Sequence, residues 1–557
     1  MDEKIINFPK DGNRYRNIAE RLNQEGKPLE ALGFLFTALK NEPKNSEVVA
    51  DIADTYADMG LSDFSNKYWF KYIDLNNEDK ISHVYEELAI NYFYLDNYWA
   101  SSYYFHLKLA TDGFISRDSL SEEIIEFLNE SFDKKSAYFI AYPYDRADYS
   151  AKLRTARRAF SAGDYKTSSM IYSSVPTECM DEDSSGDLAV SYFMCKEDEN
   201  AIDACKQSIK VHGENVTAYC NLSNLYFSAG DQEKSSYYYQ KALSLSSGAN
   251  GEEYKIATCA IEQNDSKTAA SCIGKILKER VYDPMMWYLY GVALTNTGDL
   301  TGGARAFKKA YNINPTDKVY EYYAMYVSAL ADGGKDTDKA LPLSFEKSFP
   351  EKVIKYYKKL IRECEGENAT VLMKNAKNRE IFHWGVANLE DSFAKKCSAI
   401  IGFSGSKQSE KFLFNLLLDP EVSDERKRLI IFTLIICGKK NKFGVVAGNC
   451  YVRVKPRKLI FEDAENAAFF TSAYALCVSR AIFFGIDDLD KIGFNINKVY
   501  KRFGKIITLG NYSIEDVSAL TLYICGYKRF NDLKKVCSYF GTDASKVSDM
   551  AMVLKGE

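Results

Sequence analysis

Small side chains recur at intervals of 34 residues through the middle of the sequence. Four consecutive units begin at residues 182, 216, 250 and 284, and each carries alanine, serine or glycine at its eighth and twentieth positions. The eighth positions are Ala189, Ser223, Ala257 and Gly291, and the twentieth are Ala201, Ser235, Ala269 and Gly303. An amphipathic helix alone repeats about every 3.6 residues and would not produce this longer period. We therefore expect one pair of helices in each unit, packed closely where the small residues lie.

Large aromatic residues accompany the small ones in the clearest unit. That unit contains Trp287, Tyr290, Gly291, Leu294, Gly303, Phe307, Ala310 and Pro315. This arrangement resembles the tetratricopeptide repeat (TPR), and the resemblance extends over about residues 12–330. It implies stacked helix pairs that share one continuous core and wind into a superhelix with a concave surface. Such surfaces hold other proteins, so the resemblance favours a binding function.

The repeats also divide the chain into regions. We expect an N-terminal array of three repeats (1–115), an irregular connector with a helix (116–148), a central array of five repeats with a partial capping helix (149–335), a linker (336–350) and a helical C-terminal domain (351–557). Within the last region, residues 392–437 resemble HEAT repeats, and alternating residues near 443–455 predict a β-hairpin. The predicted fold class is all-α: an α-solenoid of TPR helix hairpins, then a mostly helical domain with one small β-hairpin.

Composition narrows the class of protein further. The longest apolar run, about residues 429–437, is far shorter than the roughly 20 residues that cross a bilayer, so no membrane insertion is expected. Thirteen scattered cysteines form no Cys-x-x-Cys pair, which favours reduced thiols and a cytoplasmic protein. The net charge of −5 combines a balance of −15 in residues 1–340 with +10 in residues 341–557. The two parts therefore favour different partners, or contact with each other.

Catalytic and metal-binding patterns are not found. The four histidines have no spacing typical of metal ligands, and His383 is expected to be an ordinary surface or core residue. The segment Gly402–Lys407 resembles a phosphate-binding loop, but its glycine–lysine spacing is wrong and a helix precedes it. The sequence therefore predicts no catalytic residues, no metal and no cofactor.

The TPR resemblance also predicts which residues line the concave surfaces, because TPR proteins use the second, fifth, ninth and twelfth to thirteenth positions of each first helix. In the N-terminal array these are Asn13, Arg16, Glu20, Glu47, Asp54, Asp58, Glu86 and Tyr94. This mainly acidic lining favours segments that carry Lys or Arg. Repeats that clamp carboxylate tails have Lys and Asn where this chain has Arg16 and Glu20, so a carboxylate clamp is not expected.

The central array offers a lining of a different kind. Its predicted groove residues are Asn221, Asn224, Phe227, Tyr254, Tyr288 and Asn296. Amides and aromatic rings suit the backbone and the apolar anchors of a bound peptide. The alternative for either array is a solvated surface that binds nothing.

A basic group in the C-terminal domain supplies a second functional hypothesis. It comprises Lys439, Lys440, Lys442, Tyr451, Arg453, Lys455, Arg457 and Lys458. Positive charge beside aromatic rings can bind single-stranded nucleic acid. The same group could instead be a solvated strand edge, or could dock on the acidic N-terminal groove of its own or a neighbouring chain. We expect a non-catalytic scaffold or adaptor for partner proteins; the alternative is a nucleic-acid-associated regulator. The sequence does not predict the partner, the pathway or the oligomeric state.

Overall fold

The structure is a computed structural model of the 557-residue chain. It describes residues 12–76, 81–95, 97–113, 149–161, 165–246, 251–334, 340–364, 368–404, 406–438, 442–447, 449–454, 464–483, 489–507, 512–527 and 530–555. Helices dominate these ranges, and the one sheet among them is a two-stranded hairpin. The predicted fold class is therefore confirmed.

The N-terminal array consists of three helix pairs that begin near residues 12, 46 and 82. Its helices are α1 (Gly12–Gln24), α2 (Pro28–Asn41), α3 (Ser46–Asp58), α4 (Ser62–Leu75), α5 (Ser82–Tyr94) and α6 (Tyr98–Thr111). Local sequence sets the helix starts: Pro28 occupies the first turn of α2, and the Asn45 side chain accepts hydrogen bonds from the first amides of α3.

The central array continues the same arrangement. It contains α8 (Tyr149–Ser161), α9 (Tyr165–Tyr172), the short 3₁₀ helix η2 (Thr177–Cys179), α10 (Glu182–Met194), α11 (Asp198–His212), α12 (Val216–Ser228), α13 (Gln232–Leu245), α14 (Glu252–Glu262), α15 (Ser266–Glu279), α16 (Pro284–Asn296), α17 (Leu300–Ile313) and α18 (Lys318–Ala331). Asp231, Asp265 and Asp299 cap three successive second helices by accepting from an amide three residues ahead. The capping residues thus follow the same 34-residue period as the small ones.

The small residues lie where the repeat predicts them. Ala189, Ser223 and Ala257 are buried, and the hydroxyls of Ser223 and Ser235 each donate to the other's backbone carbonyl at 2.9 Å. A Cβ atom at Gly291 would lie 3.0 Å from the ring of Phe307. Larger side chains would therefore force the paired helices apart, as expected for close helix packing.

The C-terminal domain has one core of its own. Its elements are α19 (Glu351–Glu363), α20 (Asn368–Lys374), α21 (Ala376–Asn388), α22 (Asp391–Phe403), α23 (Lys407–Leu418), α24 (Asp424–Ile436), β1 (Phe443–Ala447), β2 (Cys450–Val454), α25 (Ala464–Phe483), α26 (Asp490–Ile507), α27 (Ile514–Ile524), α28 (Leu533–Phe540) and α29 (Ala544–Lys555). The predicted hairpin is confirmed, with β1 and β2 antiparallel and Val445 opposite Val452.

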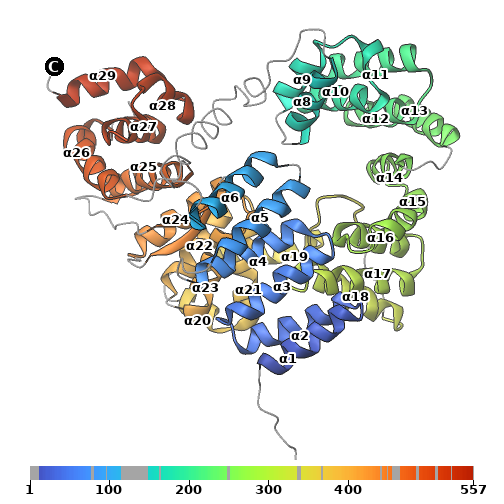
Figure 1. Cartoon of the computed structure of the whole chain (residues 1–557), viewed down its shortest axis with the longest axis horizontal. Helices are drawn as coiled ribbons and strands as arrows, with labels where there is room; N and C mark the ends of the chain where they lie inside the picture. The colour runs from blue at the N-terminus through green and yellow to red at the C-terminus, as the bar shows by residue number, and fades with distance from the viewer. Residues whose placement is uncertain are drawn as a thin grey trace, which may run out of the picture.

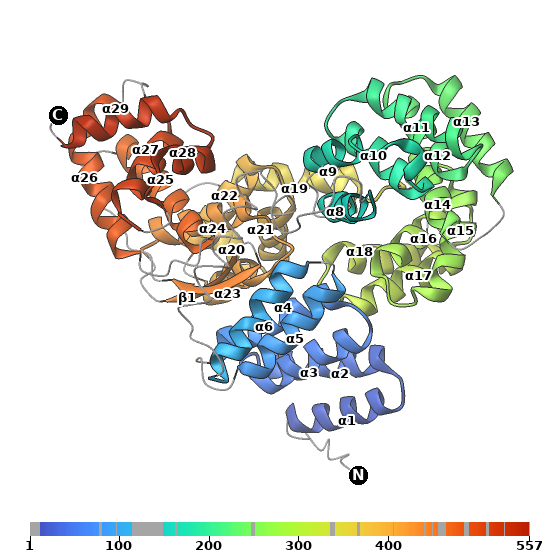
Figure 2. The same cartoon turned by 45° about the horizontal axis from the view of Figure 1, so that its top comes forward.

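The N-terminal array packs against both of the other regions (Figures 1 and 2). Its second helices α2 and α4 make most of these contacts, with α17 on one side and α23 and β1 on the other. The hydroxyl of Tyr56 donates to the carbonyl of Ile313 at 2.8 Å, and Lys67 pairs with Asp419 at 2.6 Å. In both views, α10–α13 and α26–α29 lie at opposite sides of the molecule.

Candidate functional site

The first candidate surface is the concave face of the N-terminal array, which we call the N-terminal groove. It is lined by the first helices α1, α3 and α5, whereas α2 and α4 face the rest of the chain. Of the predicted lining residues, Asn13, Glu20, Glu47, Asp54, Asp58 and Tyr94 are exposed, and Arg16 and Glu86 are half-buried.

Two cations neutralise part of the acidic lining. The guanidinium of Arg16 pairs with Glu47 and with Asp51, whose Oδ2 lies 2.5 Å from Nε. Lys108 of α6 pairs with Glu86 at 2.7 Å. Arg16 is therefore occupied within the groove wall and is not free to hold a carboxylate of a partner.

Three further carboxylates of the groove have no ion-pair partner in the described part of the chain. Asp54, Asp58 and Glu87 have no cation within ion-pair distance among the residues that the structure describes. The concave wall partly withdraws Asp54 from water, and together with the neighbouring charges of Glu87, Asp51 and Asp58 it raises the pKa of Asp54 to about 7. The pKa of Glu87 is raised as well, first by burial and then by Glu86. A cation placed here would relieve this repulsion.

An apolar end completes the N-terminal groove. Ile90, Phe93 and Tyr94 project from the last turns of α5 with 44%, 55% and 73% of their surface exposed. Ile90 and Phe93 occupy the ninth and twelfth positions of their repeat, so the positional rule could have included them. The sequence-based lining left them out, together with Glu87, which lies one position beyond the fifth.

The second candidate surface is the concave face of α14, α16 and α18, and its α16–α18 part is filled by the chain itself. Residues 340–349, which have neither helix nor strand, lie along this face. The Asn296 side chain accepts from the N–H of Leu341 at 2.7 Å and donates to the Leu341 carbonyl at 2.9 Å. Leu341, Leu343 and Phe349 are buried in the core of the array. We call residues 341–349 the internal segment.

The far end of the internal segment is held at the start of α18. The ammonium of Lys347 pairs with Asp317 at 2.6 Å and lies 4.6 Å from the centre of the Tyr320 ring. The hydroxyl of Tyr323 donates to the carbonyl of Ser348 at 3.2 Å. Because Leu341 lies at the end of α16 and Lys347 at the start of α18, the segment runs antiparallel to these first helices.

This arrangement corrects two predicted groove residues. Tyr288 is only 1% exposed, enclosed by the rings of Phe307, Tyr320 and Tyr323, and Asn296 is used by the internal segment. Neither side chain is open to a partner in this conformation. The composition of residues 336–350 predicted a linker. The described part of this stretch, residues 340–350, instead contributes buried side chains to the core of the central array.

The other predicted residues of the central array remain on an uncovered surface. Asn221 donates weakly to the Gly186 carbonyl at 3.3 Å, while Asn224 and Phe227 are half-buried. Tyr254 is exposed beneath the guanidinium of Arg280. The structure thus divides the predicted central lining into an open part on α12 and α14 and a filled part on α16 and α18.

The basic group of the C-terminal domain is not an exposed strip where it can be described. Within β2, the hydroxyl of Tyr451 donates to Asp74 of α4 at 3.1 Å, and Arg453 donates to the Asp74 carbonyl at 3.4 Å. On β1, Phe443 and Val445 join the C-terminal core, whereas Val446 joins the core of the N-terminal array. Lys442 is exposed. The other members of the group, Lys439, Lys440, Lys455, Arg457 and Lys458, lie outside the described residues.

The hairpin therefore packs between the N-terminal array and the C-terminal core. The prediction that Tyr451 and Arg453 are available to an anionic partner is wrong, because both side chains bond to Asp74. The acidic and basic parts of the chain do meet here. They meet through α4, and the hydroxyls of Tyr92 and Tyr104 also donate to Asn449 at the turn of the hairpin. Alternation predicted the two faces of the hairpin but could not show that both would be covered.

Comparison with known families supports the repeat assignment. The model of the tetratricopeptide repeat matches residues 216–248, which span α12 and α13. The chain carries tetratricopeptide repeats. None of the curated protein sequences matches this chain. Within the described residues, none of the helices has the length and apolar character to cross a bilayer, and no three His, Cys, Asp or Glu side chains are grouped to hold a metal.

Several solved structures of helical repeat proteins are similar at low identity. YrrB, a TPR protein with an unusual peptide-binding site, is 14% identical, covering 34% of this chain and 98% of its own, with a TM-score of 0.24. Yeast Tom70 is 12% identical, covering 90% and 99%, with a TM-score of 0.30. The human IFIT1 dimer with m7Gppp-AAAA is 13% identical, covering 71% and 87%, with a TM-score of 0.28. These TM-scores carry no information about the function of this chain.

Proposed function

We propose that this chain is a non-catalytic scaffold whose N-terminal groove binds a partner segment that combines basic and apolar side chains. TPR arrays serve in general as protein-interaction surfaces. The choice of this groove, and of a basic and apolar partner, rests on one observation. Asp54, Asp58 and Glu87 have no ion-pair partner among the described residues and lie on the concave face, beside exposed Ile90, Phe93 and Tyr94. Lys or Arg residues of a partner would neutralise the carboxylates, and an apolar residue would cover the end of α5.

The internal segment supports the same mode of recognition. In the central array, the Asn296 side chain bonds the backbone of the internal segment. Buried apolar side chains of the segment and the ion pair between Lys347 and Asp317 complete the contact. The N-terminal groove offers apolar and acidic groups for an equivalent contact but holds no described segment of the chain. A partner would therefore bind there in an extended or helical form without displacing any described segment of the chain.

Affinity capture from the native cell tests the proposal. The bait is the full chain, compared with Asp54→Lys/Asp58→Lys and with a control of equal charge change, Glu199→Lys/Glu233→Lys, on exposed surfaces of α11 and α13. We expect the main partners to bind wild type and control but not the groove variant, with unchanged circular dichroism throughout. Identical sets of captured proteins for all three baits would contradict the assignment of the N-terminal groove.

A further inference from the structure

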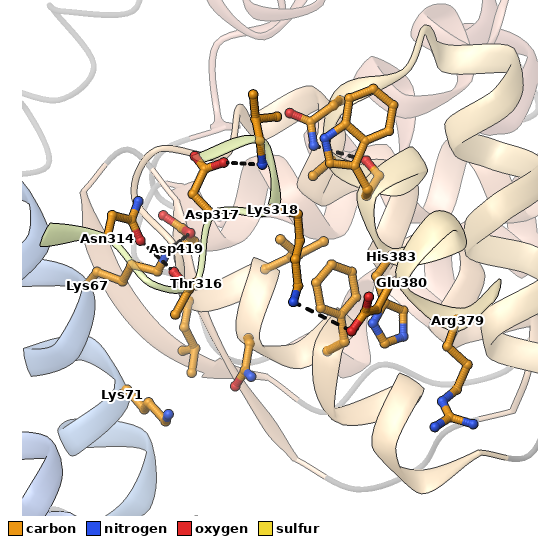
Figure 3. A pocket seen from close by; sticks show the side chains of 18 of the residues that line it. Lys67, Lys71, Asn314, Thr316, Asp317, Lys318, Arg379, Glu380, His383 and Asp419 are labelled. Atoms are coloured by element: carbon orange, nitrogen blue, oxygen red, sulfur yellow. Dashed lines mark hydrogen bonds and ion pairs between the residues drawn. The ribbon is translucent and has the colours of Figure 1, made fainter. Parts of the chain in front are cut away.

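A cavity of about 540 Å³ lies where the three regions of the chain meet (Figure 3). Its walls come from α2 and α4 of the N-terminal array, from the turn between α17 and α18, and from α21 and α23 of the C-terminal domain. This volume falls within the range of roughly 300–1,000 Å³ that is typical of small-molecule sites, which often form between domains. The cavity does not include the N-terminal groove, and it meets the central array at Lys347 of the internal segment and its partner Asp317.

Positive charge exceeds negative charge around this cavity. Five cationic side chains and three carboxylates line it. The carboxylates are all paired: Lys67 with Asp419 at 2.6 Å, Lys347 with Asp317 at 2.6 Å, and Lys318 with Glu380 at 3.5 Å. The fourth cation, Arg379, donates to the backbone carbonyls of Met373 and Lys374 at the end of α20.

Lys71 is the remaining cation of the wall. Its side chain extends from α4 toward the cavity, without a hydrogen bond or ion pair to the other residues drawn (Figure 3). The centre of the Tyr68 ring lies 5.8 Å from the ammonium. Withdrawal from water, together with Lys411 and Lys67, lowers the pKa of Lys71 to about 8. An unpaired, partly desolvated ammonium of this kind favours the approach of an anion.

His383 and Phe412 supply aromatic surface on the opposite wall. Their rings stack with centroids 4.1 Å apart and an interplanar angle of 4°. The Nε2 atom of His383 is fully buried, so the ring contributes apolar surface to the cavity and no accessible hydrogen-bonding atom at Nε2. Burial and the nearby Arg379 lower the pKa of His383 to about 4, so the ring is neutral at pH 7. Trp384 also lines the cavity.

We propose that this cavity binds a small organic anion with a planar ring, whose charged group pairs with Lys71 and whose ring lies beside His383, Phe412 and Trp384. The unpaired ammonium comes from α4 of the N-terminal array, and the ring surfaces come from α21 and α23 of the C-terminal domain. A ligand that contacted both would link the N-terminal array to the C-terminal domain. Its binding should therefore stabilise the arrangement of the three regions as well as the site itself.

Calorimetry and thermal unfolding of the full chain test this site. The probes are AMP, GMP, CMP, UMP, pyridoxal phosphate and phenylpyruvate, which share a ring and an anionic group, with adenosine and inorganic phosphate as single-feature controls. We expect at least one ring-bearing anion to bind with a Kd below about 100 μM and to raise the unfolding temperature. Adenosine and phosphate should bind at least about tenfold more weakly, because adenosine lacks the anionic group and phosphate lacks the ring.

Matched variants locate that binding. Lys71→Met should weaken binding of the probe at least about tenfold. Lys71→Arg should retain most of the affinity, and so should His383→Phe, which keeps the stacked ring. Lys210→Met, on the exposed surface of α11, makes the same charge change elsewhere and should have no effect. The site is refuted if no probe binds below 1 mM, or if a bound probe binds Lys71→Met as tightly as wild type. Quenching of tryptophan fluorescence gives a second readout, since Trp384 lines the cavity.

Discussion

The two arrays are built from the same repeat, yet their concave faces differ in what covers them. On α16 and α18 the face is occupied by the internal segment. Buried apolar side chains, two hydrogen bonds to Asn296 and the ion pair of Lys347 hold the segment there. On α1, α3 and α5 the face is open, with unpaired carboxylates and exposed aromatic residues. The close packing that builds both faces is common to all the repeats. What each face can bind is set by a few residues that do not follow the repeat.

Removing the apolar anchors of the internal segment should have the largest effect on this difference. Leu341→Ala/Leu343→Ala deletes two buried side chains, so we expect the free energy of unfolding to fall by about 4 kcal/mol. Urea denaturation measures this loss. Val371→Ala, at a side chain that is 65% exposed, serves as the control and should cost less than about 0.5 kcal/mol. Equal stability of the double variant and the control would mean that the segment does not occupy the groove.

A pair of asparagines sharpens the comparison between filled and open parts of the central array. Asn296→Ala removes two hydrogen bonds to the backbone of Leu341 and should cost about 2 kcal/mol. Asn224→Ala, on the uncovered part, breaks no hydrogen bond found in the structure and should cost much less. Limited trypsin digestion at Lys347 measures the local effect, with faster cleavage expected only for Asn296→Ala. Faster cleavage in both variants would show that the two asparagines are not distinct in role.

Aromatic residues of the N-terminal groove should respond in the opposite way from the buried leucines. Phe93→Ser and Tyr94→Ser change exposed side chains, so stability should stay within about 0.5 kcal/mol of wild type. Binding of the captured partner should nevertheless weaken by about tenfold, since an apolar anchor is lost. Thermal unfolding and calorimetry separate the two effects. A large loss of stability with unchanged binding would place these residues in a core instead of a binding surface.

The smallest expected effect is a pH dependence that originates at Asp54. Its pKa of about 7 in the folded protein exceeds the ordinary value of 3.8, so the folded state binds more protons between about pH 4 and 7. Stability from this group is present below about pH 4 and is lost as the pH rises through 7. A basic partner should bind more weakly as the pH falls below 7, because Asp54 becomes neutral. Asp54→Asn should reduce both dependences; unchanged profiles for stability and binding would contradict this assignment.

Local sequence predicted the helix pairs well because their determinants are local. Small residues at fixed positions allow close packing, aspartates at the same period cap the second helices, and alternation around Val445 and Val452 predicts the hairpin. The acidic N-terminal lining followed from positions in the repeat, and its open state is seen in the exposed side chains of α3 and α5.

Contacts between distant parts of the chain could not be predicted in this way. Pro342 and Pro350 favour an extended backbone but do not indicate that Asn296 will bind it. The charge of Arg453 does not reveal that Asp74, far away in sequence, accepts its hydrogen bond. Lys71 and His383 likewise line the same cavity only because three regions of the chain pack against each other. No spacing in the sequence predicts that packing.

Hydrogen–deuterium exchange of the full chain, with and without a partner captured through the N-terminal groove, tests the central claim most directly. The account predicts slow exchange of residues 341–349 in the free protein and no change there when the partner binds. New protection should appear only in residues 46–58 and 82–94. Fast exchange of residues 341–349 in the free protein, or partner-induced protection of α16 with release of the internal segment, would contradict the division into a filled and an open groove.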